Sequence, residues 1–308
     1  MMRLSTQYMY QSNIDSLSRA MNEGNDIYTR LSTGQMLLRP SDNPAGASQA
    51  VIYQSALSTI NQYDTARMYA YDSLGQEDNV LNSIGNILTK NLTEKIVAGG
   101  NGTMSDADRQ ALATELQGIR DNLMDLANSR NSNGRYIFAG YETGKPPFLD
   151  DGTYVGGNTA LSQKVAESTD MKVGHTGNDI FLSGTDDDIF VALDRAIEAL
   201  NTPVVTDEDR EALQQVLDGV NISLSRAIEN LGKIQAEVGT NLQQIEALGF
   251  SSDTQKINLQ TRLQQTVGSD YDSMISLISQ SKMTEFALSS SMMVFQSMQN
   301  MSLFNTLR

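Results

Sequence analysis

Proline is confined to three short places in this chain, and this distribution sets the first limit on its fold. Two stretches, 45–145 and 204–308, contain no Pro. Nothing in these stretches removes the backbone N–H groups that a long helix needs. The segment between them is different, because nine of the 23 Gly residues lie between 134 and 184. The sequence therefore predicts long helices towards both ends of the chain and an irregular segment between them.

The N-terminal half carries apolar side chains at alternating spacings of three and four, which is typical of amphipathic helices. The first such helix is expected over residues 3–34, with Gly34 just after its end. Asn43 precedes Pro44 as an N-cap and predicts a second helix over 44–98. A third helix is expected from Ser105, which forms a capping-box pattern with Asp108, to about residue 133.

The C-terminal half repeats this pattern. Helix is expected from about residue 188 to 200, and Thr206 is a suitable cap for a longer helix that follows. A polar break is expected at 249–253, after which the apolar pattern returns and continues to Phe304. In the N-terminal half, the second expected helix has a seam from Leu57 to Leu92 with a period of 3.5 residues, which predicts helices that supercoil around one another.

Residues 135–187 break the helical pattern. Short β-prone runs at 135–140, 153–155 and 179–182 lie between Gly and Asp turns. They predict a small β-rich domain inserted into a helical body. We expect residues 141–187 of this insert to be a self-contained surface domain that could be deleted without loss of assembly.

Together these patterns predict a mainly α fold, in which both chain ends build a long-helix coiled-coil bundle and a small β-rich domain is inserted. We expect three parts. The terminal helices, 1–44 and 265–308, form an inner coiled-coil assembly domain, and 45–134 with 188–264 form a long-helix bundle. Residues 135–187 form the outer insert.

Composition excludes several classes of function. The net charge is −15 with no basic run, which argues against binding to nucleic acid or to an anionic membrane. The sequence has no Cys and one His, so disulfides, Cys-ligated metals and two-His metal motifs are impossible within one chain. No apolar run is long enough for a transmembrane helix, and we expect no cleaved signal peptide.

Three polar motifs were considered as sites. His175 is interpreted as a polar turn residue rather than a general base, because no acid or nucleophile has a defined spacing from it. Asp186–Asp188 lacks the pattern of a calcium loop and is interpreted as a helix cap with solvated neighbours. Gly99–Gly102 is a helix stop, because no Lys follows as in a phosphate loop. We therefore expect no catalytic, metal or cofactor site.

The apolar stripes at the two ends have no evident partner. The C-terminal one is rich in Met, and only Lys282 and Glu285 are charged between 273 and 307. Such a surface adapts to several partners. We expect an assembly interface made of Tyr10, Ile14, Leu17, Met21, Tyr28, Leu31, Tyr271, Met274, Ile278, Met283, Ala287, Met293, Val294, Met301 and Phe304.

Several motifs resemble those of one protein family. The run Arg30-Leu31-Ser32-Thr33-Gly34 is similar to the signature of bacterial flagellins, and the segment 39–47 resembles the Pro-Ser-Asp-Asp-Pro version found in the L-type hook-associated proteins. Asn43 stands where that family usually has Asp, and both residues cap helices. Further similar segments are 133–141, 154–157, 177–181 and 298–304.

The resemblance implies a structural protein of the bacterial flagellum at the hook–filament junction. It implies an inner tube of terminal helices, self-association in a ring, and contacts with the first, K-type hook-associated protein and with flagellin. It also implies a cytosolic chaperone on the C-terminal segment before type III export, and a final extracellular location. Filament flagellin itself and a non-flagellar coiled-coil adaptor are the alternatives. An enzyme ranks last.

Overall fold

The computed structural model describes the backbone of residues 2–306 and the side chains of residues 8–299. The chain is mainly α-helical, with long helices from both ends and a small antiparallel sheet in its middle, as the sequence predicted. It divides into two compact units. The terminal unit takes residues up to Asn61 and from Asp253 onwards, and the central unit takes Gln62–Ser252.

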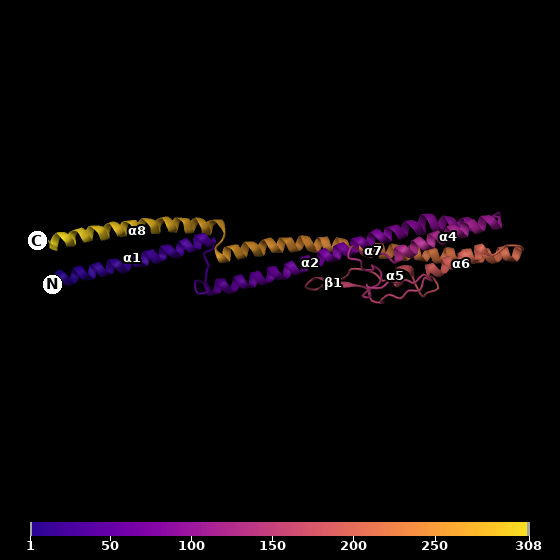
Figure 1. The fold of residues 1–308 in the computed structure, drawn as a ribbon, viewed down its shortest axis with the longest axis horizontal. Coiled ribbons are helices and arrows are strands. Elements are labelled where there is room, and N and C mark those ends of the chain that lie inside the picture. Colours follow the sequence, from indigo (N-terminus) through magenta and orange to yellow (C-terminus); the bar gives the residue numbers. More distant parts are fainter. Residues whose placement is uncertain (1, 307–308) are drawn as a thin grey trace. The chain divides into compact units, whose positions relative to one another are not determined.

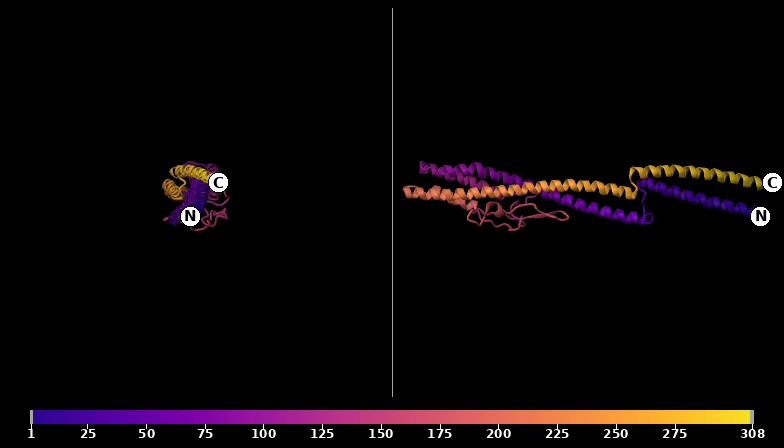
Figure 2. Two further views of the ribbon diagram at one scale, coloured as in Figure 1. Left: turned by 90° about the vertical axis from the view of Figure 1, so that its left-hand side faces the viewer. Right: turned by 180° about the vertical axis from the view of Figure 1, so that it is seen from behind.

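The terminal unit is made of helices from both ends of the chain. Helix α1 (Met2–Thr33) and helix α8 (Tyr271–Thr306) lie side by side in all three ribbon views (Figures 1 and 2). The unit also takes the first part of α2 (Pro44–Asn86) and the last part of α7 (Asp207–Val267).

The central unit contains the remaining elements. Helix α2 continues through a π-helical segment, η1 (Ile87–Leu92), into α3 (Thr93–Gly99). The elements that follow are α4 (Asp106–Ala127), β1 (Ser162–Ala166), β2 (Thr169–Lys172), α5 (Gly177–Phe181) and α6 (Ile189–Asn201), and α7 completes the unit. Strands β1 and β2 pair antiparallel, with a register irregularity between Lys164 and Ala166.

Most of the predicted helix ends are confirmed by their caps. Asn43 Oδ1 accepts from the backbone of Gly46 at 3.0 Å, and Ser105 forms its capping box with Asp108. Thr206 and Asp209 cap α7 reciprocally, and Asp188 caps α6. Gly34 has a φ of +68° directly after α1, where a side chain would strain the backbone.

Two predicted helix boundaries are wrong. Helix α4 ends at Ala127 and not near residue 133. At its end, the side-chain amide of the C-cap residue Asn128 exchanges two hydrogen bonds with the backbone of Phe148. The polar break expected at 249–253 does not exist, since α7 runs unbroken from Asp207 to Val267. Polar residues there are compatible with helix as long as one side is solvated.

The predicted strands of the insert are also wrong in place. The runs 135–140 and 153–155 each contain one isolated β-bridge residue, Tyr136 and Tyr154, and form no strand. Residues 179–182 coincide largely with α5, whose N-terminus is capped by Thr176. The actual strands, β1 and β2, have little apolar alternation and gave no clear sequence signal. Local pattern could not locate them, because their pairing is stabilised by contacts with α2 and α7.

One hydrophobic core unites the insert with the helices around it. The rings of Phe148 and Phe181 from the insert lie within 5.3 Å of each other and of Phe190 on α6. Val165 and Met171 belong to the same buried cluster. The insert is therefore not self-contained, and deleting it would expose core side chains. Other fully buried members are Leu74, Leu81, Leu116, Leu123 and Leu193.

Candidate assembly surface

The face of α1 that turns towards α8 is lined by partly covered residues at spacings of three and four. They are Asn13, Leu17, Ala20, Gly24, Ile27 and Leu31. This 3.5-residue repeat is the pattern of a coiled-coil seam. Its centre is made of small residues, and a Cβ on Gly24 would already lie 3.6 Å from Thr284 of α8. Small side chains therefore let the two helices approach closely.

The facing side of α8 repeats the same spacing. Its partly or fully covered residues are Met274, Leu277, Ser281, Thr284, Leu288, Ser291, Phe295 and Met298. The ring of Phe295 lies 5.4 Å from that of Tyr10, and the amide of Asn13 donates to Met298 Sδ at 3.1 Å. The two ends of the chain thus form a pair in matched register.

One ionic contact lies near the C-terminal end of α1. The Tyr28 hydroxyl donates to Glu285 Oε1 at 2.6 Å, and Lys282 lies 2.9 Å from the other oxygen of this carboxylate. The hydrogen bond raises the pKa of Tyr28, and it lowers the pKa of Glu285 together with Lys282. The only two charged residues between 273 and 299 are thereby paired with each other.

The turn into α8 depends on one glycine. Gly268 has a φ of +66°, and a Cβ there would lie 2.6 Å from Cβ of Met36. The backbone N–H groups of Met36 and Leu37 donate to the carbonyl of Val267 at 3.0 Å. The segment after α1 is therefore fastened to the end of α7, which fixes where the terminal pair begins.

Little of the terminal unit is buried. Among its described side chains and glycines, only Ala50, Gly268, Leu277 and Ser281 are buried. The central unit, by contrast, has a large core. Because burial of apolar area is the main favourable term in folding, the terminal pair gains little stability from its own packing.

Helix α8 is apolar on more than the side that α1 covers. Nine residues separate Leu277 from Phe286, which at about 100° per residue places them on opposite sides of the helix. Leu277 is fully buried, whereas Phe286 is 74% exposed. Met293 points within about 20° of the direction of Phe286 and is 62% exposed. A helix that is hydrophobic all round is normally buried on every side, so this surface needs further partners.

The residues predicted for the interface fall into three groups. Leu17, Leu31 and Met274 are half-buried on the pair, and Tyr10 contacts Phe295 while remaining largely exposed. Met301 and Phe304 lie outside the residues whose side chains are described. The exposed ones are Ile14, Met21, Tyr28, Tyr271, Ile278, Met283, Ala287, Met293 and Val294. Their role in contacts between subunits stays a prediction.

Sequence reasoning missed several members of this surface. Phe286 and Ile275 are exposed apolar residues on the outer side of α8. Leu277, on the side that faces α1, is the most buried residue among the described side chains of α8. A second stripe half a turn away from the first would have identified them. Small residues between the two helices give no hydropathy signal, and only the structure shows that they face one another. They are Ala20, Gly24, Ser281 and Thr284.

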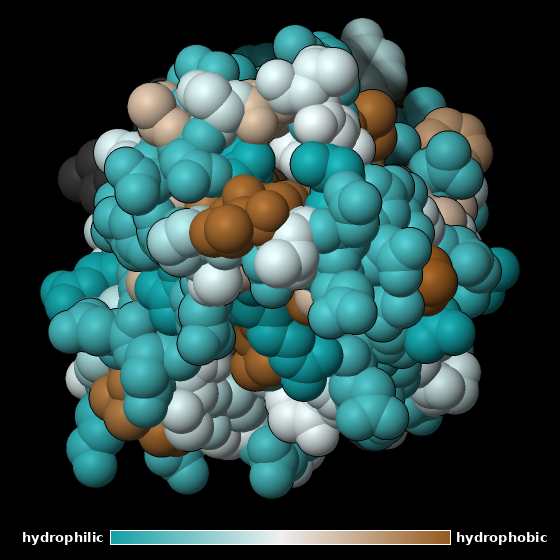
Figure 3. All heavy atoms as spheres, turned by 90° about the vertical axis from the view of Figure 1, so that its right-hand side faces the viewer, coloured by the Kyte–Doolittle hydropathy of each residue, from teal (hydrophilic) through white to brown (hydrophobic). Residues whose placement is uncertain are grey.

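The other unit looks different. Figure 3 views the right-hand end of Figure 1, where the turn between α3 and α4 and the turn between α6 and α7 lie. Hydrophilic residues dominate this face, and hydrophobic ones form small separate patches. Within residues 2–306, no helix has the length and apolarity required to cross a membrane. No cluster of metal-binding side chains occurs among the side chains that the structure describes.

We predict that both terminal helices are poorly ordered in the isolated monomer, because so few of their side chains are buried in the pair. Limited proteolysis followed by mass spectrometry should trim both ends and leave a resistant core of roughly residues 45–265. Complete protection of both ends in a preparation shown to be monomeric would contradict this expectation.

Comparison with known proteins supplies independent information. Residues 4–143 match the model of the bacterial flagellin N-terminal helical region. The chain is 38% identical to flagellar hook-associated protein 3 of Escherichia coli strain K12, over 98% of its own length and 99% of that protein. It is 39% identical to the protein of the same name from Salmonella typhimurium, with the same coverage.

Solved structures agree at the level of the fold. The crystal structure of FlgL from Xanthomonas campestris superimposes with a TM-score of 0.62 at 20% identity. The match covers 69% of this chain and 99% of that one. At this identity the likeness shows a shared fold.

Proposed function

The chain belongs to the flagellar hook-associated protein 3 family and is a structural protein of the bacterial flagellum, and on this premise we propose that it is the subunit that joins the hook to the filament. It joins the first, K-type hook-associated protein to the flagellin filament, and it assembles through its terminal helices. The observation that carries the proposal is the surface of the terminal pair α1–α8. Its outer side exposes large apolar residues, and the terminal unit buries very few side chains of its own.

The proposed partners follow from this surface. Copies of the chain associate in a ring, and the outer side of α8 is buried against neighbouring terminal helices. Before assembly, a cytosolic chaperone covers the C-terminal segment, since exposed Phe286, Met292 and Met293 would otherwise favour aggregation. The chain then leaves the cell through the flagellar type III apparatus and acts outside it.

We propose a separate role for each of three parts of the chain. Residues 1–44 and 265–308 assemble, 45–134 and 188–264 support them as a bundle, and 135–187 face outward. No part acts as an enzyme or carries a cofactor. The support for this is membership of a structural family.

The test is deletion of the gene in the bacterium that carries it, followed by electron microscopy of the cell surface. We expect hooks that end in the first hook-associated protein and carry no filament, while flagellin is secreted into the medium. Restoring the gene should restore filaments. Normal filaments on the deletion strain would contradict the proposal.

Immunogold labelling of the complemented strain separates the alternatives. Label confined to the junction between hook and filament supports the proposed role. Label along the whole shaft would identify the chain as filament flagellin instead. Flagella without any label, in cells that contain the protein, would favour a non-flagellar coiled-coil adaptor.

A further inference from the structure

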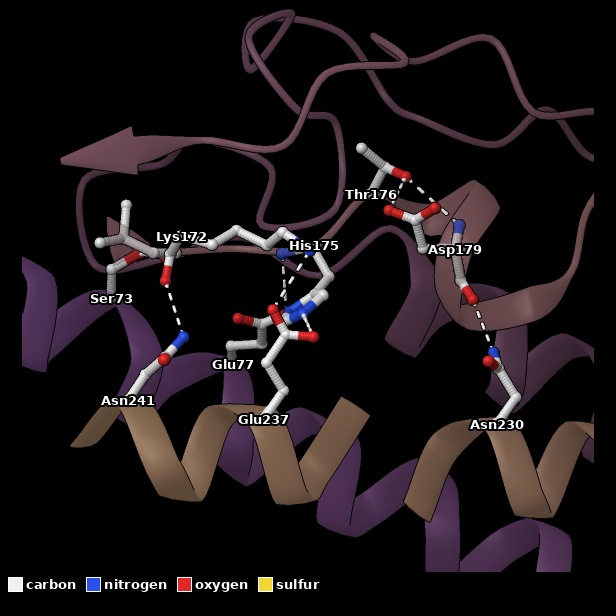
Figure 4. A network of polar contacts seen from close by, with 10 residues as sticks. Ser73, Glu77, Lys172, His175, Thr176, Asp179, Asn230, Glu237 and Asn241 are labelled. Carbon is white, nitrogen blue, oxygen red and sulfur yellow. Dashed lines mark hydrogen bonds and ion pairs between the residues drawn. The ribbon is translucent and has the colours of Figure 1, made fainter. Parts of the chain in front are cut away.

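The single histidine of the chain is buried between two carboxylates. His175 is 2% exposed, and its ring lies between Glu77 on α2 and Glu237 on α7 (Figure 4). Glu77 Oε1 accepts from the backbone N–H of His175 at 2.9 Å and lies 2.8 Å from ring Nδ1. The sequence alone indicates a polar turn residue here, and His175 does lie in the irregular stretch between β2 and α5, but there it is buried and paired with carboxylates.

The geometry assigns different roles to the two ring nitrogens. Because Nδ1 faces a carboxylate at hydrogen-bond distance, it carries a hydrogen in the neutral ring as well as in the charged one. The proton that is gained or lost therefore sits on Nε2, which lies 3.4 Å from Glu237 Oε2. In the neutral ring, Nε2 has a lone pair close to this carboxylate and no hydrogen-bond partner. In the charged ring, Nε2–H is attracted to it.

The charges around His175 balance only when it is protonated. Glu77 and Glu237 contribute two negative charges, and Lys172 of β2, 3.2 Å from Glu237, contributes one positive charge. These three groups sum to −1, and a protonated His175 brings the sum to zero. Glu77 is completely buried and one of its oxygens has no hydrogen-bond partner. An incompletely compensated buried charge is strongly unfavourable.

Further charged groups nearby are already engaged. Lys233 of α7 pairs with Glu229 at 2.8 Å, and the carboxylate of Asp179 accepts from the Thr176 hydroxyl at 2.8 Å. Lys172, His175 and Glu237 border a surface groove of about 490 Å³, which brings solvent to the cluster. His175 can therefore exchange protons with solvent although its ring is buried.

The cluster of Glu77, His175, Glu237 and Lys172 joins the segment 162–179 to helices α2 and α7. Other bonds across the same joint are neutral or permanently charged. Ser73 donates to the carbonyl of Val173, and Asn241 donates to that of Lys172. Arg67 donates to the carbonyl of Val165, and Asn230 donates to that of Asp179. Among the groups at this joint, His175 is the one whose ordinary pKa lies in the physiological range.

We propose that Glu77, His175 and Glu237 form a pH-sensitive clamp, which holds the strand segment 162–176 on α2 and α7 when His175 is protonated and loosens when it loses that proton. An exposed position outside the cell would subject such a clamp to changes of ambient pH. The clamp is a property of the central unit and does not depend on the role proposed for the terminal helices.

The direction in which pH changes the stability of the clamp follows from the opposing influences on the pKa of His175. Burial alone lowers the pKa of the imidazole, but the hydrogen bond and charge of Glu77, together with the charge of Glu237, outweigh it and raise the pKa above the ordinary 6.5. The protonated form is thus favoured in the folded state. The stability it contributes is fully present below pH 6.5 and is lost as the pH rises through the raised pKa.

The chain's single histidine makes the first measurement direct. In a two-dimensional NMR spectrum of the full-length monomer, one histidine Cε1–H signal is expected, and it should titrate above 6.5. Hydrogen–deuterium exchange then tests the clamp. After correction for intrinsic rates, opening of 162–176 should increase by about tenfold for each pKa unit of the measured elevation, while α4 remains unchanged.

Variants on α7 supply the control. Glu237→Gln removes the partner of Nε2 from a partly exposed position, so the histidine pKa should fall and the pH dependence of exchange should shrink. Glu229→Gln, two turns away on the same helix, removes a comparable charge that does not face His175 and should change neither. His175→Gln should abolish the pH dependence. A histidine that titrates at or below 6.5, or an equal pH dependence in His175→Gln, would overturn the proposal.

Discussion

Met293→Asp is expected to abolish attachment of the filament to the hook while leaving the melting temperature of the isolated monomer within roughly 2 °C of the parent. The Met293 side chain is 62% exposed on the outer side of α8, so the monomer loses almost no packing. In an assembly that covers this side, an unpaired carboxylate would cost several kcal/mol, and the cost would recur in every subunit. Electron microscopy of complemented deletion cells and thermal unfolding of the purified monomer measure the two effects.

Two further variants make this experiment discriminating. Leu17→Asp places the same charge on the half-buried seam of α1 and should also prevent attachment with little change in the melting temperature. Leu116→Asp, on α4, is the contrasting control, because Leu116 is fully buried in the central core and its replacement should lower the melting temperature strongly. If Leu17→Asp destabilised the monomer as much as Leu116→Asp, the terminal helices would be part of its packed core.

Phe148→Ala is expected to lower the free energy of unfolding by about 3–5 kcal/mol. Phe148 is 2% exposed and its ring contacts those of Tyr154, Phe181 and Phe190, so its removal leaves a cavity where the insert meets α6. Urea unfolding of the monomer, followed by circular dichroism, measures the change.

The neighbouring residue provides a matched control. Leu149 is 46% exposed, and Leu149→Ala removes a similar apolar side chain without opening a core cavity. Its effect should stay within about 1 kcal/mol. The contradicting result is a free energy of unfolding of the helices that Phe148→Ala leaves unchanged. That result would show that residues 135–187 behave as a separate domain and that the shared core does not stabilise the helices.

The helical framework was predictable because its signals are local. Caps such as Ser105 with Asp108, and Thr206 with Asp209, require only residues a few positions apart. The absence of Pro and the spacing of three and four were enough to identify the long helices. The errors occurred where distant groups come together, as at Asn128, the C-cap residue of α4, whose side chain bonds to the backbone of Phe148.

For the candidate surface, the sequence identified the elements but not the sides of the helices. The sequence pattern selected Met21 and Met293 for the assembly interface, and both are exposed, whereas the residues between the two helices include Gly24 and Ser281. Large apolar residues indicate that a helix must be covered. They do not indicate by which neighbour, because a close approach of two backbones is permitted by small residues that carry little hydropathy.

The sequence by itself determined the helix-forming segments, most of their capped ends and the flagellar family, because propensity, capping and motif resemblance depend on residues that are neighbours in the chain. Only the tertiary structure decided that the insert shares the central core and that His175 meets Glu77, 98 positions away. The physical reason is that burial and charge pairing depend on which residues meet in space. No local pattern in the chain specifies that meeting.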